Sequence, residues 1–399
     1  MKVVHLSTTD FGGAYKAAER ISASMKSVGV DSKVLVRTKT RIDTDGIEVI
    51  NTPLKKFISK TKNVGNLLLS EGNIISDYFG TDISKNQYVK DADVIFLHWV
   101  NSFISYQDVE KLIKLNKKII WVMHDMWLFT GGCHCDQYCG RYQFDCGYCP
   151  MLKKEKDNDI SRKNFSRKQK MLQNGNIILV GPSEWIVSCA KNSRITNRKR
   201  IERIPNPIDI QMFRPIEKDI LFEKYNIDNK KKVILYGAMN AVGDKNKGYI
   251  FLKNAVEKID KTKYQLLIFG NKAVDTEMEK NIQTIFLGYI HEEKTLVDLY
   301  NIADVFVCPS QQENYPYAVL EAQACNTPVV AFRIGGIPDI ISHKETGYLC
   351  TYGNVEEMVE GIEFCSNLKH EICGKVNRIN SYAAIGNQYK KLACEYINS

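Results

Sequence analysis

Residues 305–332, VFVCPSQQENYPYAVLEAQACNTPVVAF, decide the fold of this chain. The runs Val305–Cys308 and Pro328–Phe332 are short and apolar, which is typical of strands that are buried on both faces of a sheet. Between them, a polar loop leads into a helix that begins near Pro316, because proline suits the first helical turn. The stretch therefore predicts a strand–helix–strand unit with parallel strands.

The same alternation of apolar runs and helix-length amphipathic segments continues along most of the chain. The predicted strands form two series, Lys2–Ser7, Lys33–Val36, Val94–Trp99, Lys118–Met123 and Asn176–Val180, then Lys232–Tyr236, Tyr264–Phe269, Thr284–Leu287, Val305–Cys308 and Pro328–Phe332. Two such series predict an α/β protein of two doubly wound, Rossmann-like domains. Prolines interrupt the pattern in Ile204-Pro-Asn-Pro-Ile-Asp209, so we place the domains at residues 1–204 and 205–380. Ligands of open parallel sheets bind beyond the carboxyl ends of the strands, which predicts a site in a cleft that the two domains face.

Composition narrows the class of protein further. The chain has 399 residues, of which 44% are hydrophobic and 25% charged, as in globular proteins and unlike disordered or collagen-like chains. No apolar run is long enough to span a membrane, and the chain opens as a strand without a signal-peptide pattern, so we expect a cytoplasmic protein. The formal net charge of +9 suits an anionic partner, which includes a nucleotide, a phospholipid surface or a nucleic acid.

Two carboxylates stand out in the opening stretch. Glu313 lies in the predicted loop, and Glu321 follows on the predicted helix. The first N–H groups of that helix and its positive end form a natural seat for a diphosphate. Carboxylates beside this seat would repel phosphates, so sugar hydroxyls are their natural partners. On spacing alone, a loop acid and a solvated helix acid explain the pair equally well.

The stretch resembles the Glu-x7-Glu signature of retaining glycosyltransferases of family 4, which have the GT-B fold. The resemblance extends to Pro182-Ser-Glu-Trp185, Asn206-Pro-Ile-Asp209, Thr327-Pro-Val-Val-Ala-Phe332, Gly335-Gly-Ile-Pro-Asp339 and Thr346-Gly-Tyr-Leu349. It implies an acceptor-side N-terminal domain, a C-terminal domain that binds a nucleotide-sugar, and a last helix within residues 381–399 that packs back on the first domain.

The resemblance also implies roles for residues of the second domain. Glu321 would bind the ribose of the donor and Glu313 the transferred sugar at the reaction centre. The donor-binding residues implied beside them are Asn314, Tyr315 and Tyr317.

A cation is expected in the same domain, since the departing diphosphate is negatively charged. Lys247, in the pair Lys247-Gly248, matches the lysine that the family places there. However, Ala238 stands where the family has an arginine, and Lys245 and Asn240 are the candidates to compensate for it.

In the first domain, the pair Gly12-Gly13 follows the first predicted strand. A glycine pair alone predicts only a tight turn, but the resemblance implies a loop that approaches the donor phosphate or the acceptor. His124 follows another strand, and the family has a histidine there that implies contact with the transferred sugar or the acceptor. The residues expected on the acceptor side are His98, Asn101 and Asp125.

The resemblance implies a retaining glycosyltransferase that needs no metal for catalysis. It would move a sugar from a nucleotide donor, which in this family is most often UDP-linked. The acceptor would be a polyprenyl-diphosphate-linked or growing bacterial glycan of a capsule, exopolysaccharide or O-antigen. The alternatives are another GT-B enzyme, such as a nucleotide-sugar epimerase or a sugar-phosphate synthase, a non-catalytic sugar-binding partner, and a metal-stabilised nucleic-acid-binding protein. The last leaves the two glutamates unexplained, and the sequence has no aromatic-basic recognition motif, so we expect no nucleic-acid partner.

Five of the twelve cysteines fall in a loop at about residues 131–150. Cys146 and Cys149 have the spacing of a zinc knuckle, which Cys139 with Cys133 or Cys135 would complete. Reduced thiols, a local disulfide and an iron–sulfur cluster are the alternatives. The block from His124 to His134 resembles a subgroup of these transferases from exopolysaccharide, capsule and O-antigen clusters, and this resemblance implies a structural zinc held by Cys133, Cys139, Cys146 and Cys149.

Residues 153–170 carry eight basic and three acidic side chains, with Phe165, Met171 and Leu172 nearby. A solvated helix is the ordinary interpretation of such a segment. The alternative is an amphipathic surface that holds a peripheral enzyme on anionic lipid at the inner face of the cell membrane, where a polyprenyl-linked acceptor would lie.

Overall fold

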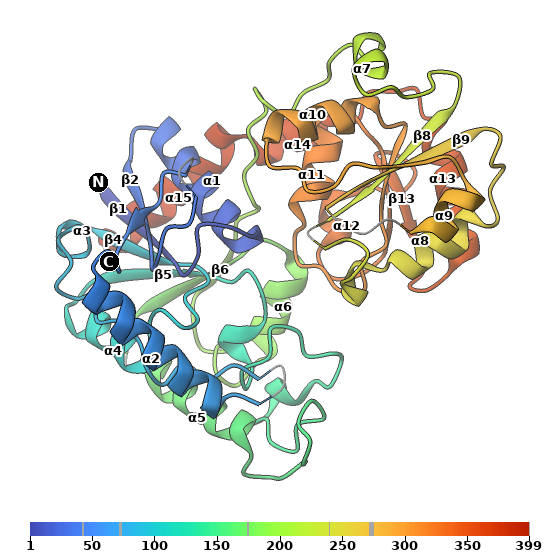
Figure 1. Cartoon of the computed structure of the whole chain (residues 1–399). Helices are drawn as coiled ribbons and strands as arrows, with labels where there is room; N and C mark the ends of the chain where they lie inside the picture. Colours follow the sequence, from blue (N-terminus) through green and yellow to red (C-terminus); the bar gives the residue numbers. More distant parts are fainter. Residues whose placement is uncertain (42–43, 72–73, 174, 239, 271–274, 399) are drawn as a thin grey trace. The chain divides into compact units, whose positions relative to one another are not determined.

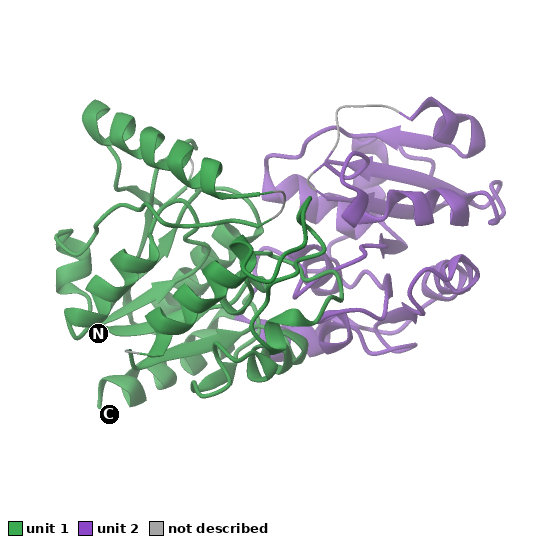
Figure 2. Ribbon diagram, turned by 90° about the horizontal axis from the view of Figure 1, so that it is seen from below, with its two compact units in different colours: residues 1–207, 382–399 green, residues 208–381 purple. Residues whose placement is uncertain are grey.

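The computed structural model describes residues 1–41, 44–71, 74–173, 175–238, 240–270 and 275–398. The chain forms two compact units, of which unit 1 comprises Met1–Pro207 with Tyr382–Ser399 and unit 2 comprises Ile208–Ser381 (Figure 2). These bounds lie within a few residues of the domain limits expected at 204/205 and 380/381.

Unit 1 is built on a seven-stranded parallel sheet with the order β3-β2-β1-β4-β5-β6-β7 (Figure 1). The strands are β1 (Lys2–Ser7), β2 (Asp31–Val36), β3 (Ile47–Glu48), β4 (Val94–Leu97), β5 (Lys118–Val122), β6 (Ile177–Gly181) and β7 (Ile201–Arg203). The helices are α1 (Gly13–Ser27), α2 (Pro53–Leu69), α3 (Gln87–Asp91), α4 (Tyr106–Lys114), α5 (Ile160–Gln173), α6 (Glu184–Asn192) and α15 (Tyr382–Ile397), with short 3₁₀ turns η1 (Trp127–Phe129) and η2 (Arg141–Gln143).

Unit 2 is built on a six-stranded parallel sheet with the order β10-β9-β8-β11-β12-β13. The strands are β8 (Lys232–Gly237), β9 (Tyr264–Phe269), β10 (Thr284–Phe286), β11 (Val305–Cys308), β12 (Val329–Phe332) and β13 (Gly347–Cys350). The helices are α7 (Asp219–Lys224), α8 (Tyr249–Val256), α9 (Thr276–Asn281), α10 (Glu293–Ile302), α11 (Tyr317–Ala324), α12 (Ile337–Ile340), α13 (Val355–Cys365) and α14 (Cys373–Asn380), with the 3₁₀ turn η3 (Lys245–Lys247).

The central strands of both sheets are buried along their whole length, as β4, β6, β9, β11 and β12 show. This burial explains why continuous apolar runs, rather than alternating ones, identified them. The strand order reverses between β1 and β4 in unit 1 and between β8 and β11 in unit 2. The loops that follow these four strands therefore lie where doubly wound sheets bind ligands.

Helix α15 returns to unit 1, in agreement with its expected position. Its residues Ile385, Tyr389 and Tyr396 join the core formed by β1, β4, β5 and β6. The helix approaches α1 closely at Gly386, where an added Cβ would lie 2.0 Å from the carbonyl oxygen of Ser24. In the described parts of the chain, no helix combines the length and the apolar character needed to cross a membrane.

We predict that Gly386→Ala lowers the free energy of unfolding of unit 1 by about 1–3 kcal/mol, because the methyl group has no room against α1. Helix propensity acts in the opposite direction, since alanine is favoured over glycine inside a helix by about 1 kcal/mol. Urea unfolding followed by tryptophan fluorescence isolates unit 1, because Trp99, Trp121, Trp127 and Trp185 all belong to it.

The matched control is Gly374→Ala in α14, where an added Cβ would meet only Glu371 Oε1 at an ordinary 3.7 Å. This control should leave the tryptophan-detected transition unchanged. An unchanged or higher stability of Gly386→Ala would contradict the close packing of α15 on α1.

Candidate functional site

Beyond the carboxyl ends of the central strands β8 and β11 of unit 2, Lys247 and Glu313 form an ion pair. Lys247 Nζ donates to Glu313 Oε1 at 2.7 Å, from the end of η3 to the loop between β11 and α11. Both side chains are largely covered, with exposures of 29% and 16%. Burial alone would lower the pKa of Lys247, but the charge of Glu313 and the hydrogen bond to it outweigh this effect and raise the pKa. Lys247 is therefore charged, and the pair lies beside the reversal of strand order.

Polar contacts join the two loops that carry this pair. The backbone N–H of Gln311 donates to the carbonyl of Asn246 at 2.8 Å, and Gln311 Nε2 donates to the carbonyl of Lys245 at 2.7 Å. Tyr352 Oη in turn donates to Gln311 Oε1 at 2.8 Å. The sequence analysis did not single out Gln311, which fixes the loop of Glu313 against η3.

Glycines allow the backbone to approach closely around the same loop. Gly335 has a φ of +48°, and an added Cβ there would lie 1.9 Å from the carbonyl oxygen of Glu313, to which Gly336 N donates at 3.2 Å. Gly248 has a φ of +70°, and its Cβ would lie 1.8 Å from the carbonyl oxygen of Pro309. Only glycine fits these positions, because a side chain would be strained and would displace the loop.

Glu321 is buried within α11, with an exposure of only 2%, and it accepts a hydrogen bond from Tyr300 Oη at 3.2 Å. The interpretation of Glu321 as a solvated helix acid is therefore wrong. A buried carboxylate needs polar partners, because its desolvation is costly. Pro316 precedes α11 and supplies no side-chain cap, so the beginning of this helix is a suitable seat for an anion.

The remaining residues expected in unit 2 lie around α11 and β8. Tyr315 is buried, and its hydroxyl accepts from Asn380 Nδ2 at 3.2 Å, while Asn314 and Tyr317 are half-buried. Ala238 is half-buried after β8, and its carbonyl oxygen lies 1.8 Å from where a Cβ on Gly270 would be. It is Lys247, and not the exposed Lys245, whose side chain the structure brings to Glu313. The pKa of Cys308, at the end of β11, is raised to about 11 by burial.

In unit 1, three histidines form a continuous chain of hydrogen bonds. His5 Nδ1 and His98 Nε2 are 2.9 Å apart, and His98 Nδ1 and His124 Nε2 are also 2.9 Å apart. His5 belongs to β1, His98 follows β4 and His124 comes shortly after β5. Because β1, β4 and β5 are neighbours in the sheet, their carboxyl ends bring the three rings together.

The three rings are neutral at physiological pH. Burial lowers the pKa of His5 to about 3 and that of His124 to about 4, and it places the pKa of His98 well below its usual value. Each neutral ring carries one proton, so all three protons lie on Nδ1 or all three on Nε2 for both hydrogen bonds to form. Among the described residues, His5 Nε2 is buried without a hydrogen-bond partner. An unpaired buried donor is rarer than an unpaired buried acceptor, which favours protons on Nδ1 and makes His124 Nδ1 a donor.

The other residues expected in unit 1 have different surroundings. Asp125 accepts from Trp127 N at 2.8 Å and lies 2.7 Å from His134 Nδ1. Asn101 is buried, and its carbonyl oxygen accepts from Thr8 Oγ1 at 2.7 Å. Gly12 has a φ of +84° at the start of α1, with open space where its Cβ would be, and Gly13 is the first residue of that helix.

The cysteines expected to bind metal, Cys133, Cys139, Cys146 and Cys149, line one small cavity. Cys135 does not line it, and none of the four cysteines is in a disulfide in this structure. Over the described ranges, no group of three or more histidines, cysteines or acids has a spacing suited to a metal ion.

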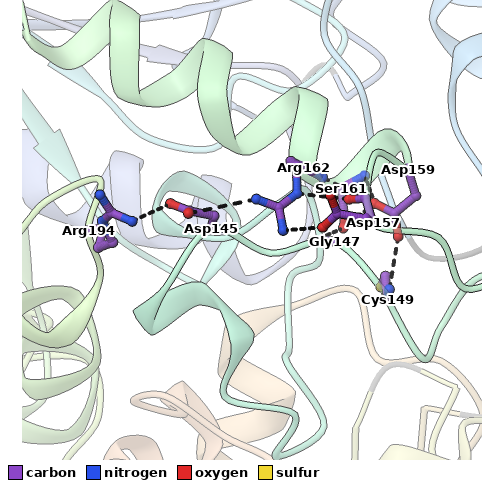
Figure 3. Close-up of polar contacts among 8 residues, drawn as sticks. All are labelled: Asp145, Gly147, Cys149, Asp157, Asp159, Ser161, Arg162 and Arg194. Atoms are coloured by element: carbon purple, nitrogen blue, oxygen red, sulfur yellow. Dashed lines mark hydrogen bonds and ion pairs between the residues drawn. The ribbon is translucent and has the colours of Figure 1, made fainter.

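Charged contacts tie this loop to the start of α5 (Figure 3). Asp145 pairs with Arg194 at 2.8 Å and with Arg162 at 3.7 Å, and Arg162 also pairs with Asp157 at 2.7 Å. Asp159 accepts from the backbone N–H of Cys149 at 2.9 Å. The loop is thus held by ion pairs and by hydrogen bonds to its backbone.

The basic segment at residues 153–170 does not present an amphipathic surface. Phe165, Met171 and Leu172 are fully buried in the core of unit 1. Lys168 is also fully buried, where it donates to the carbonyl oxygens of Trp127 and Thr130, and burial lowers its pKa to about 7. These apolar side chains stabilise the fold, so they do not form the lipid-facing side of an amphipathic surface.

The sequence is similar to a family of known proteins and to several of their members. Residues 217–384 match the family model described as glycosyl transferases group 1, almost entirely within unit 2. An uncharacterized 41.2 kDa protein from the cps region of Klebsiella pneumoniae is 26% identical over 227 residues, which cover 53% of this chain and 61% of that protein. The N-acetyl-alpha-D-glucosaminyl L-malate synthase of Bacillus anthracis is 26% identical over 167 residues, which cover 39% of this chain and 42% of the synthase. The chain thus matches less than two thirds of the length of these relatives.

Solved structures match over nearly the whole chain. Sucrose-phosphate synthase from Thermosynechococcus elongatus has a TM-score of 0.69 at 16% identity and 99% coverage of both chains. Anabaena HepE in complex with UDP-glucose has a TM-score of 0.67 at 14% identity, covering 99% of this chain and 100% of HepE. At such identities the likeness concerns the fold, which is GT-B, with two Rossmann-like domains on parallel sheets.

We predict that the histidine chain makes unit 1 less stable in acid. The pKa values of His5 and His124 are lowered in the folded protein, so between about pH 6.5 and pH 4 the unfolded chain binds more protons than the folded one. The free energy of unfolding therefore falls as the pH drops through this window, by up to about 1.4 kcal/mol per pH unit for each histidine.

The variant His5→Asn tests this effect, because its amide can replace Nδ1 without titrating in this range. It should reduce the slope of the unfolding free energy against pH, measured by tryptophan-detected urea unfolding, by about 1.4 kcal/mol per pH unit, the contribution of one proton. His291→Gln, at an exposed position of unit 2, is the control and should keep the full slope. Equal slopes in His5→Asn and the parent protein would contradict a neutral, buried His5.

Proposed function

We propose that this protein is a retaining glycosyltransferase that moves a sugar from a UDP-linked donor to a lipid-linked or growing bacterial surface glycan. The observation that carries the proposal is the Lys247–Glu313 ion pair next to buried Glu321, at the reversal of strand order in unit 2. This arrangement lies within the segment that matches the group 1 glycosyl transferases. HepE, which has a similar fold, was solved in complex with UDP-glucose, and this complex supports a UDP-linked donor.

The donor would bind with its diphosphate at the start of α11. Glu321 would accept hydrogen bonds from the ribose hydroxyls, and its contact with Tyr300 holds its carboxylate in place. Glu313 would hold the hydroxyls of the transferred sugar. Lys247, released in part from Glu313, would stabilise the negative charge that develops on the departing diphosphate.

The transfer itself needs few protein groups. The acceptor hydroxyl would form a bond to the anomeric carbon on the face from which the diphosphate departs, and its proton would pass to the leaving phosphate oxygen. This course retains the anomeric configuration without a covalent enzyme intermediate or a divalent ion. The protein would then act by positioning the substrates and stabilising charge.

Unit 1 would serve the acceptor and the transferred sugar. His124 would donate a hydrogen bond from Nδ1, as the direction of the histidine chain favours, rather than act as a base. His98 would position His124 from beneath, and the loop with Gly12 and Gly13 would leave room for a substrate. A relative from a cps region and the fold of WaaG, a glycosyltransferase involved in lipopolysaccharide biosynthesis, support a surface glycan as the product.

We predict that UDP raises the Tm of unit 2 and that Glu321→Gln removes about half of this effect or more. At a ligand concentration about 100 times Kd, the gain in stability is about 2.7 kcal/mol, which corresponds to several degrees in Tm. Glutamine keeps an acceptor for Tyr300 but loses the charge, so UDP should bind roughly ten- to one-hundred-fold more weakly. Scanning calorimetry is the suitable measurement, because the tryptophans report on unit 1 alone.

The control is Glu345→Gln, at an exposed position of unit 2, which should respond to UDP as the parent protein does. A panel of other nucleoside diphosphates in the same experiment identifies the base. A folded protein that responds to no nucleotide would contradict the proposal.

We further propose that the cysteine loop takes up a structural zinc through Cys133, Cys139, Cys146 and Cys149. Thiolates are ligands that zinc prefers and all four line one cavity, but the loop would have to bring them closer together to bind the ion. Bound zinc would hold the irregular segment that follows His124 and would take no part in the transfer.

We predict that protein purified without chelator contains about one zinc per chain and that Cys149→Ser loses most of it, measured by elemental analysis. Removal of the metal should also lower the tryptophan-detected stability of unit 1, because binding energy in such a site is folding energy. Cys189→Ser is the control, since Cys189 does not line the cavity. Zinc-free protein of undiminished stability would contradict a structural zinc.

A further inference from the structure

Helix α2 (Pro53–Leu69) exposes its apolar side chains. Leu68 is 80% exposed, Leu67 is 73% exposed, and Leu54 and Phe57 are 68% and 67% exposed. The other exposed apolar side chains of the helix are Ile58, Val64 and Leu69. An ordinary surface helix turns such side chains to the core and its polar ones to water, so α2 is oriented in the opposite way.

The polar face of α2 is the one that packs against unit 1. The buried residues of the helix are Ser59 and Asn66, which lie seven positions apart and so share one face. At about 100° per residue, Leu54, Phe57 and Leu68 fall on the opposite face, about half a turn away. The exposed apolar face is therefore continuous along the whole helix.

Specific hydrogen bonds hold the helix in this orientation. Asn66 Oδ1 accepts from the backbone N–H groups of Tyr78 and Phe79 at 3.0 and 2.9 Å, and Asn66 Nδ2 donates to the carbonyl of Phe79 at 2.8 Å. Arg37 Nη1 donates to Asn63 Oδ1 at 3.1 Å on the same side. Hydrogen bonds thus hold the polar face of α2 against unit 1, and the apolar face is exposed as a result.

Every charged residue of the helix is a lysine. Lys56 and Lys60, four positions apart, lie along one border of the apolar face, whereas Lys55 and Lys62 share the stripe of Ser59 and Asn66, at spacings of three and four residues. Lys56 pairs with Glu48 at 3.3 Å, and Lys62 donates to the carbonyl of Gly80. An exposed apolar face on a helix whose charges are all positive is the pattern of a helix that lies in the surface of an anionic bilayer.

We propose that α2 (Figure 1) docks the protein on an anionic lipid bilayer, with its apolar face at the boundary of headgroups and acyl chains and its lysines on lipid phosphates. Phe79, 46% exposed, extends this surface, because its ring lies 3.0 Å from where a Cβ on Gly65 would be. The inference deepens the proposed function, since it rests on a lipid-linked acceptor. It replaces the basic segment at 153–170, whose apolar side chains are buried, as the lipid-binding element.

The test is co-sedimentation of the full chain with vesicles of phosphatidylcholine, with and without phosphatidylglycerol. We expect binding to the anionic vesicles that weakens with added salt, because the lysines contribute by charge. The double variant Phe57→Gln/Leu68→Gln should bind about ten-fold more weakly for each side chain changed, since a buried side chain of this size contributes at least this much. Lys55→Gln/Lys60→Gln should weaken binding about five-fold per lysine on anionic vesicles only.

Two controls change similar side chains elsewhere. Leu115→Gln/Ile220→Gln alters exposed apolar residues outside α2, and Lys163→Gln/Lys170→Gln alters exposed lysines of the basic segment. Both should bind vesicles as the parent protein does. The response of Tm to UDP should survive in every variant, so a failure of docking is distinguishable from a failure of the proposed function.

The proposal is overturned if the parent protein ignores anionic vesicles, or if Phe57→Gln/Leu68→Gln binds them undiminished. Sedimentation velocity distinguishes a second copy of this chain from a lipid bilayer as the partner of the apolar face of α2. A parent protein that dimerises without binding vesicles, and becomes monomeric in Phe57→Gln/Leu68→Gln, would show that a second copy of this chain covers α2 instead.

Discussion

Parallel pairing of strands is the constraint on which the rest of the structure depends. A parallel strand must be entered from the same edge each time, so every crossover helix returns the chain to one edge and every carboxyl end collects at the other. In unit 1 this brings His5, His98 and His124 into a single hydrogen-bonded chain from three separate parts of the sequence. In unit 2 it brings Lys247 and Glu313 together in the same way. The chemistry is thus a consequence of topology, and the helices are needed chiefly to cover the sheets.

Close backbone approach sets the second level of organisation. The loops after these strands pack closely on neighbouring backbone. Glycines at positive φ, such as Gly248 and Gly335, allow this close approach, and side chains such as Gln311 join one loop to the next by hydrogen bonds. In such a setting, a buried polar group is tolerated because it is paired. Glu321 with Tyr300, and Lys168 with two carbonyl oxygens, follow this rule at opposite signs of charge.

The elements that the sequence predicted best are those whose environment is uniform. Long apolar runs such as Val305–Cys308 are buried on both faces, so composition alone identifies them. The edge strands β3, β7 and β13 escaped prediction, because runs of two to four residues carry little pattern. Glu313 and Lys247 were predicted through the family motif, whereas His5 was not, since a histidine in an apolar strand gives no sign of its partner. The orientation of α2 was equally hidden, because an amphipathic pattern does not state which face meets the core.

The return of α15 to unit 1 has a consequence for the synthesis of the protein. The ribosome completes the whole of unit 2 before it releases the helix that supplies Ile385, Tyr389 and Tyr396 to the core of unit 1. The N-terminal sheet therefore lacks the cover of α15 until all of Ile208–Ser381 has been synthesised. Assembly order is the reverse of chain order: the domain translated first is the one finished last. Synthesis that halted after unit 2 and before α15 would leave a formed unit 2 attached to an open N-terminal core, a natural substrate for chaperones.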